Sequence, residues 1–270
     1  MELGLTGKVA LVTGGGMGVG RAICKQLASE GAAVIVNDIV AGRCDAVRDE
    51  IVAAGGTAVA APFDITDLDA TMAGVGKAVA ATGAVDILVN NAGVVPERRS
   101  GEIGLPTFRE MPPQYWKKIV DLNYYGVMHC VAAVVDGMVE RHSGKIVSIV
   151  SDAARLGEAR MAVYSGAKAA IIGFSKAIAR ELGPHGINVN AVSLSAVAHE
   201  NPIARFQNPD ATVETDDMLR KVLRNYPIGQ GLGRLTRPED AADAVAFLAS
   251  DRSAYVTGQV LGVNGGFAMI

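Results

Sequence analysis

Short runs of branched apolar residues alternate along the chain with longer segments whose apolar positions recur every three or four residues. The short runs predict buried strands, and the longer segments predict amphipathic helices. The expected strands are residues 8–12, 33–37, 57–63, 85–90, 145–150, 187–192 and 260–263. The expected helices lie near residues 20–30, 42–54, 67–82, 112–140, 162–182 and 238–249. This alternation predicts an α/β, Rossmann-like fold: a doubly wound parallel sheet of about seven strands with helices on both faces.

The 270 residues contain no Pro-, Gly- or Ser-rich linker and no internal repeat, which predicts one domain over residues 1–270. Two segments interrupt the alternation: residues 94–113 after the fourth expected strand and residues 194–231 after the sixth. Ligands of doubly wound sheets bind beyond the carboxyl ends of the strands. We therefore expect these segments to be substrate loops, the alternative being surface insertions without a role.

Composition narrows the classes of partner. Half of the residues are hydrophobic and 20% are charged, which excludes a disordered chain. A net charge of −3 leaves no basic excess for a nucleic acid or a membrane surface, and no apolar run is long enough for a membrane span. The first residues lack a basic signal region, so we expect a cytoplasmic protein. Three cysteines without a CxxC predict buried thiols, and four scattered histidines without an HExxH predict no metal site.

Residues 13–20 (TGGGMGVG) join the first expected strand to the first expected helix. Glycines at such a junction let the backbone approach a pyrophosphate, whose charge meets the free amides of the helix start. The spacing is TGxxxGxG rather than GxGxxG, so a purely structural turn is the alternative interpretation. We predict a dinucleotide-binding loop with contacts from Gly14, Gly16, Met17, Gly18 and Val19.

Asp38 ends the second expected strand. A carboxylate in that position accepts hydrogen bonds from an adenosine ribose diol and repels a 2′-phosphate. The chain is therefore predicted to bind NAD(H) rather than NADP(H). Arg43 lies just downstream and is able to reach such a phosphate, and a solvated turn is the alternative role for Asp38.

Tyr164 and Lys168 are one helical turn apart within the expected helix over residues 162–182, so their side chains share a face. A nearby ammonium lowers the pKa of a phenol from its ordinary value near ~10 and makes it a usable proton donor and acceptor. Ser151 follows the fifth strand, where its hydroxyl would hold a substrate carbonyl oxygen, and Asn123 is a polar residue in an apolar helix. Alternatively, Ser151 caps the strand end and Asn123 satisfies the backbone.

The ordered combination of motifs resembles the short-chain dehydrogenase/reductase family over nearly the whole chain. The motifs are residues 13–20, Asp64 within residues 62–67, residues 90–93 (NNAG), Asn123, Ser151, residues 164–168 (YSGAK) and residues 256–266. The resemblance implies that Tyr164 is the general acid or base and that Ser151 orients and polarises the carbonyl. It implies that Lys168 binds the nicotinamide ribose and lowers the pKa of the tyrosine, while Asn123 holds the water of a proton relay.

The same resemblance implies adenine contacts from Asp64 and Ile65, and a cofactor wall built from residues 90–93. It also implies a homotetramer or homodimer. The predicted catalytic residues are Asn123, Ser151, Tyr164 and Lys168. The predicted cofactor-binding residues are Gly14, Gly16, Met17, Gly18, Val19, Asp38, Asp64, Ile65, Asn91, Ala92, Gly93, Tyr164, Lys168 and Val197.

The sequence departs from the family pattern after the sixth strand, where Leu194 and Ser195 replace the usual Pro-Gly pair. We expect the contact of Val197 with the cofactor to survive, because it is made mainly by the backbone. His199, near the position of the family's Thr, is either a second polar group in the pocket or a solvated loop residue. Arg98 and Arg99 either meet an anionic substrate or form a solvated tip.

The predicted function is that of an NAD(H)-dependent oxidoreductase that interconverts a secondary alcohol and a ketone by hydride transfer. Apolar pocket candidates favour a hydrophobic cyclic, aryl or acyl substrate; they are Ala153, Leu156, Met161, Val163 and Val197. Three arginines leave room for a phosphate-bearing thioester such as an acyl-CoA, the alternative being that they only make the surface soluble: Arg155, Arg160 and Arg205. The alternatives are a non-catalytic NAD-binding regulatory protein, an NADP-dependent 3-oxoacyl-type reductase, and a nicotinamide-assisted epimerase or lyase.

Overall fold

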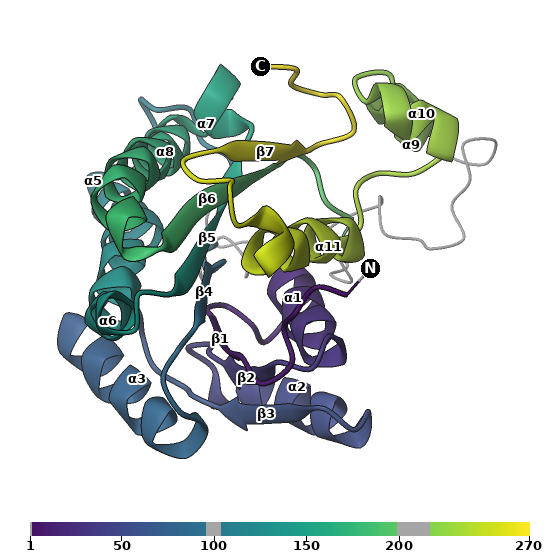
Figure 1. Cartoon of the computed structure of the whole chain (residues 1–270). Coiled ribbons are helices and arrows are strands. Elements are labelled where there is room, and N and C mark those ends of the chain that lie inside the picture. The colour runs from purple at the N-terminus through teal and green to yellow at the C-terminus, as the bar shows by residue number, and fades with distance from the viewer. Residues whose placement is uncertain (1, 96–103, 199–216) are drawn as a thin grey trace.

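A computed structural model describes residues 2–95, 104–198 and 217–270 of the chain (Figure 1). Its described strands form one seven-stranded sheet in the order β3-β2-β1-β4-β5-β6-β7, and every neighbouring pair is parallel. The strands are β1 Val9–Val12, β2 Ala33–Val36, β3 Thr57–Ala60, β4 Ile87–Asn90, β5 Gly144–Ser151, β6 Ile187–Leu194 and β7 Val260–Val263. The predicted fold class, a doubly wound α/β sheet, is confirmed.

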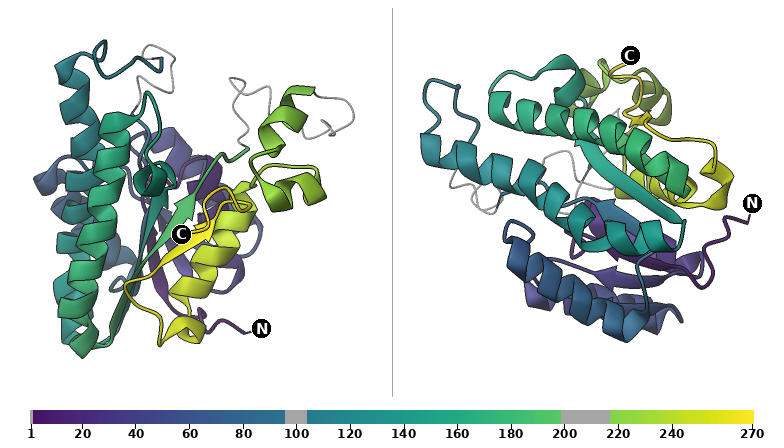
Figure 2. Two further views of the ribbon diagram at one scale, coloured as in Figure 1. Left: turned by 90° about the horizontal axis from the view of Figure 1, so that it is seen from above. Right: turned by 60° about the vertical axis from the view of Figure 1, so that its left-hand side comes forward.

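Helices cover both faces of the sheet, as the two views of Figure 2 show. One layer contains α1 Gly18–Ser29, α2 Ala41–Ala53 and α11 Pro238–Ala249. The other contains α3 Leu68–Thr82, α5 Pro113–Val120, α6 Gly126–Glu140 and α8 Ala162–Leu182. None of the described helices is both long enough and apolar enough to cross a membrane.

The alternation of side chains along each strand divides the core between the two layers. On β1, Ala10 and Val12 belong to the apolar cluster beneath α1 and α11, whereas Leu11 belongs to the cluster beneath α3 and α6. All four residues of β1 are buried. A strand covered on both faces has to be apolar throughout, and this explains why the strands are visible in the sequence as continuous apolar runs.

The structure departs from the expected elements most clearly in three places. The third strand ends at Ala60 rather than at residue 63, because Pro62 has no N–H to donate to the sheet. The helix expected over residues 112–140 is divided into α5, a π-helical turn η1 Asp121–Tyr125, and α6. Part of the expected loop 194–231 forms helices, α9 Asp217–Leu223 and α10 Pro227–Leu232.

The smaller elements complete the described chain: α7 Ala153–Leu156, η2 Gly183–His185 and η3 Asp251–Ser253. The three cysteines are free and buried, as the sequence predicted. Burial raises the pKa of the Cys130 thiol to about 12, so this group is an apolar core side chain rather than a reactive thiol.

Replacing Leu11 tests the core of the sheet. Leu11 is 0% exposed on a central strand, so Leu11→Ala should lower the free energy of unfolding by about 2–5 kcal/mol through lost burial and the cavity left behind. Leu68, at the start of α3, is 45% exposed, and Leu68→Ala is the matched control with an expected loss below about 1 kcal/mol. Urea denaturation measures both, and equal losses would contradict the assigned core.

Candidate active site and cofactor cavity

Lys168 is the charged residue of the predicted catalytic set, and it is buried. It lies on α8 with 3% of its surface exposed, and its Nζ donates a hydrogen bond of 2.8 Å to the carbonyl oxygen of Ile149 on β5. The same Nζ lies 5.9 Å from the ring centroid of Tyr164, one turn earlier on the helix. Burial lowers the pKa of Lys168 to about 8.

Asn123 is buried within the π-helical turn η1. Its Nδ2 donates a hydrogen bond of 3.0 Å to the carbonyl oxygen of Ile119, one turn earlier. Its Oδ1 is buried and has no hydrogen-bond partner among the described residues. A π-helical turn displaces the chain relative to a regular helix and is frequent at functional sites, and here it carries the predicted relay residue.

Gly93 is the point at which Asn123 and Lys168 meet. A Cβ atom at Gly93 would lie 2.9 Å from Asn123 Oδ1 and 2.9 Å from Lys168 Nζ. Only a residue without a side chain fits between these two groups. The NNAG motif therefore places its last glycine directly against the predicted catalytic residues, on the segment that follows β4.

Ser151 is the last residue of β5, and its Oγ accepts a hydrogen bond of 3.2 Å from the backbone N–H of Ala153. This contact matches the capping role that the sequence left open, and the hydroxyl proton stays available for another acceptor. Tyr164 lies in the first turn of α8, which packs against α7 and against β5. The structure thus groups Asn123, Tyr164 and Lys168 around Gly93 and places Ser151 at the end of the adjacent strand.

Two cavities adjoin at the segment after β4. The larger, of about 610 Å³, is lined by Gly14, Met17, Asp38, Asp64, Ile65, Ala92 and Gly93, all of them predicted cofactor-binding residues. The smaller, of about 150 Å³, is lined by Asn123 and Tyr164. Both cavities are bordered by Gly93, Val94 and Val95, so Asn123 and Tyr164 lie beside the cavity predicted to hold the cofactor, whereas Ser151 and Lys168 line neither cavity.

The glycine loop packs too closely against its neighbours to accept side chains. Gly14 has a φ of +60°, and a Cβ there would lie 2.9 Å from the Cα of Ala92. A Cβ at Gly16 would lie 2.9 Å from Asp38 Oδ2. Asn91 also holds the loop in place, because its Nδ2 donates hydrogen bonds of 3.0 Å to the carbonyl oxygens of Thr13 and Gly14.

Asp38 is 5% exposed in the loop after β2 and lines the larger cavity. Its Oδ1 accepts a hydrogen bond of 3.0 Å from the N–H of Val40 and lies 3.7 Å from Arg43 NH1. Asp64, at the same cavity, uses its Oδ1 to accept from the N–H and the hydroxyl of Thr66. Both carboxylates are therefore held in fixed orientations by local turns.

Several lining residues carried no signal in the sequence. Lys118, Asp121 and Leu122 reach the larger cavity from α5 and η1, and Asn37, Ile39, Val40, Phe63 and Thr66 reach it from loops. In the smaller cavity these residues are Gly104, Met111 and Ile119. Contacts made by a helix far away in the chain depend on the fold, and the π-helical turn that contains Asn123 is visible only in the structure.

Other sequence expectations have different outcomes. Of the apolar pocket candidates, Met161 lines the smaller cavity, and so does Arg160. Val197 forms a β-bridge with Thr236. Leu194 completes β6 opposite Val263, and Ser195 Oγ lies 2.9 Å from the hydroxyl of Tyr226. His199, Arg98, Arg99 and Arg205 lie outside the described residues.

Comparison with known proteins agrees with this geometry. A family model described as "short chain dehydrogenase" matches residues 8–209. The chain is 36% identical over 265 residues to the 3-oxoacyl-[acyl-carrier-protein] reductase FabG of Staphylococcus aureus strain Mu50, covering 97% of this chain and 98% of the relative. It is also 36% identical over 264 residues to the protein of that name from Escherichia coli strain K12, covering 98% of each. The chain belongs to the short-chain dehydrogenase family of oxidoreductases.

The buried ammonium predicts a measurable pH dependence of stability. The pKa of Lys168 falls from 10.5 to about 8 on folding, so between these values the unfolded chain binds more protons and stability rises with pH. Lys168→Met should lack this rise. Between pH 7 and 10, the free energy of unfolding of the wild type should gain about 2–3 kcal/mol relative to Lys168→Met. Parallel slopes in denaturant titrations of the two proteins would show that the ammonium is solvated.

Proposed function

We propose that the protein is an NAD(H)-dependent oxidoreductase that interconverts a secondary alcohol and a ketone. The observation that supports this most strongly is the grouping of Asn123, Tyr164 and Lys168 around Gly93, where the two cavities adjoin. A protein that only bound a nucleotide would have no need for a buried lysine beside a tyrosine at the junction with a second cavity.

The larger cavity fits a nicotinamide dinucleotide. The glycine loop leaves no room for side chains at Gly14 and Gly16, and α1 begins within it at Gly18, so free amides of the helix start are available to a pyrophosphate. Asp38 and Asp64 would hold the adenosine end. Gly93 and Lys168 would hold the nicotinamide ribose. The bound cofactor supplies hydride acceptance or donation at the junction of the cavities.

The chain's own residues supply proton transfer and orientation. An ammonium close to a phenol favours the phenolate, so Lys168 prepares Tyr164 to take the alcohol proton or to return it to the ketone. Ser151 would donate its hydroxyl proton to the carbonyl oxygen. Asn123 Oδ1, which has no partner among the described residues, is free to accept a hydrogen bond from a water next to Lys168.

The smaller cavity favours a hydrophobic substrate. Its walls include Val94, Val95, Met111, Ile119 and Met161, with Arg160 as its charged residue. Arg160 NH1 donates a hydrogen bond of 2.8 Å to the carbonyl oxygen of Leu105. An acyl group with an anionic carrier suits apolar walls that end in an arginine, so we propose an acyl thioester, with cyclic and aryl alcohols as the other members of the test panel.

Two observations bear on the choice between NAD(H) and NADP(H). Asp38 is buried at the cavity wall, and a 2′-phosphate beside its carboxylate would be repelled. Arg43, the cation able to meet such a phosphate, is already ion-paired with Asp38. The second candidate function is an NADP-dependent 3-oxoacyl-type reductase: the names of the relatives support a 3-oxoacyl substrate, and the proximity of Arg43 supports NADP. The cytoplasmic location and the assembly into a homotetramer or homodimer remain predictions.

Tyr164→Phe tests the chemistry. This variant should lose turnover by at least about a thousandfold because the proton donor is gone, whereas NADH binding should change by less than about twofold. Turnover is measured as the change in nicotinamide absorbance, with NAD and with NADP, on hydroxyacyl thioesters, hydrophobic secondary alcohols and polyols. NADH binding is measured by fluorescence titration. Tyr125→Phe, on the exposed side of η1, is the matched control.

Retained turnover in Tyr164→Phe would remove this residue from catalysis, and preferential turnover of polyols would overturn the substrate class.

Asp38→Ala tests the cofactor assignment. Removing the carboxylate ends the repulsion and releases Arg43, so the ratio of kcat/KM for NAD to that for NADP should fall by about tenfold or more. Asp45→Ala, which removes a half-buried aspartate of α2 that is ion-paired with Arg48, is the control and should leave the ratio unchanged. An unchanged ratio in Asp38→Ala would refute the contact of Asp38 with the adenosine ribose.

A further inference from the structure

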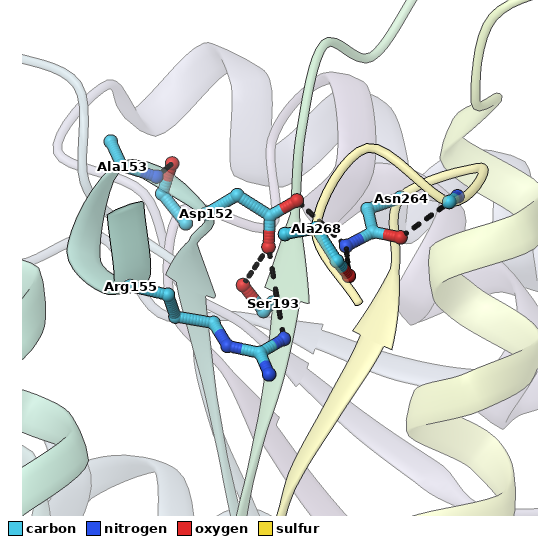
Figure 3. Close-up of polar contacts among 8 residues, drawn as sticks. Asp152, Ala153, Arg155, Ser193, Asn264 and Ala268 are labelled. Atoms are coloured by element: carbon cyan, nitrogen blue, oxygen red, sulfur yellow. Dashed lines mark hydrogen bonds and ion pairs between the residues drawn. The ribbon is translucent and has the colours of Figure 1, made fainter. Parts of the chain in front are cut away.

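Asp152 directly follows Ser151 and is 1% exposed. Its Oδ1 accepts a hydrogen bond of 2.6 Å from Ser193 Oγ, and its Oδ2 accepts one of 2.7 Å from Asn264 Nδ2. Arg155 NH1 lies 4.0 Å from Oδ1, with only 11% of the arginine side chain exposed. Figure 3 shows these side chains converging on one carboxylate from α7, β6 and the segment after β7.

The backbone of Asp152 is held as firmly as its side chain. Its N–H donates to the carbonyl oxygen of Leu194 at 2.9 Å, and its own carbonyl oxygen accepts from the N–H groups of Arg155 and Leu156 at 2.9 Å each. A residue whose N–H, carbonyl and carboxylate are all engaged has little freedom in φ and ψ. These contacts hold the backbone next to Ser151, whose Oγ accepts from the N–H of Ala153, the residue after Asp152.

Asn264 extends the cluster to the end of the chain. Its Nδ2 also donates 2.9 Å to the carbonyl oxygen of Ala268, and its Oδ1 accepts from the N–H of Gly266 at 3.1 Å. The carboxyl ends of β5, β6 and β7 are thus joined through a single side chain. Burying a carboxylate is costly, and such a group is retained when its hydrogen bonds specify a geometry.

We propose that Asp152 is a positioning residue that fixes the Ser151 hydroxyl relative to Tyr164 by joining the ends of these three strands. The inference rests on the proposed function, because Ser151 is the group through which Asp152 acts. Asp152 lines neither of the two cavities. Its effect reaches the reaction only through the orientation of Ser151.

A double-mutant cycle separates this role from a general loss of stability. Asp152→Asn keeps the size of the side chain but removes the charge and one acceptor, and it should lower kcat by about tenfold while NADH binding changes by less than about twofold. In a Ser151→Ala background, the same substitution should have no further effect on kcat. Asp152→Ala, which leaves Ser193, Asn264 and Arg155 without their acceptor, should lower kcat more than Asp152→Asn does.

Asn188→Ala is the matched control at the opposite end of β6, where Asn188 Nδ2 donates to the carbonyl oxygens of Ala254 and Val256. It should lower the melting temperature without lowering kcat at a temperature where all variants are folded. An equal loss of kcat in Asn188→Ala would overturn the proposal. So would a tenfold effect of Asp152→Asn that persists in the Ser151→Ala background.

Hydrogen exchange measured by mass spectrometry gives a readout that needs no turnover. Asp152→Asn should exchange faster than the wild type in peptides covering residues 151–157 and 262–268, whereas Asn188→Ala should not. If the wild type turned over no alcohol in the panel, the proposed function would fail. Hydrogen exchange would then be the measurement that decides whether Asp152 holds the segment around Ser151 in place. Unchanged exchange at residues 151–157 in Asp152→Asn would overturn it.

Discussion

The site depends on one constraint: the charged ammonium of Lys168 is buried beside β5, a central strand of the parallel sheet. Lys168 is removed from water and retains one carbonyl acceptor, that of Ile149. Burial of a charge is unfavourable, and the depressed pKa of the group expresses that cost. The fold accommodates it by placing Gly93 where a side chain would collide, and by turning Asn123 toward the same point.

The parallel arrangement explains why these groups meet. Every strand of the sheet ends at the same edge, so the glycine loop after β1, Gly93 after β4 and Ser151 at the end of β5 lie near one another although they are far apart in the chain. The two cavities follow from this arrangement. One extends over the loops after β1 and β2, and the other lies between the segment after β4 and the start of α8.

Much of this could be predicted from the sequence because its signals are local. The β1 run is buried on both faces and therefore apolar throughout, and Tyr164 and Lys168 are one helical turn apart. The family motifs identified the class of enzyme, which the comparisons confirmed. Asp38 was predicted from its place after the second strand, where a doubly wound sheet binds its ligands, and Asp64 from the family resemblance; both line the larger cavity.

The features that escaped prediction depend on contacts between distant residues. The π-helical turn η1 interrupts a segment whose apolar pattern suits an unbroken helix. The Asp152 cluster joins residues separated by 41 and by 112 positions, and no local pattern marks that pairing. Helix α10 contains two glycines, and its sequence favours a loop. The neighbouring helix α9 packs through a small apolar cluster that includes Leu223 and Tyr226, and this packing depends on contacts between separate segments.

The most direct test of the central claim is to follow the hydride itself. The alcohol that the enzyme oxidises best is prepared with deuterium on its carbinol carbon, and the NADH formed is analysed by mass spectrometry. Direct hydride transfer at the junction of the two cavities predicts that each NADH carries one deuterium from the substrate. Undeuterated NADH, or conversion of the alcohol without any nicotinamide reduction, would contradict it.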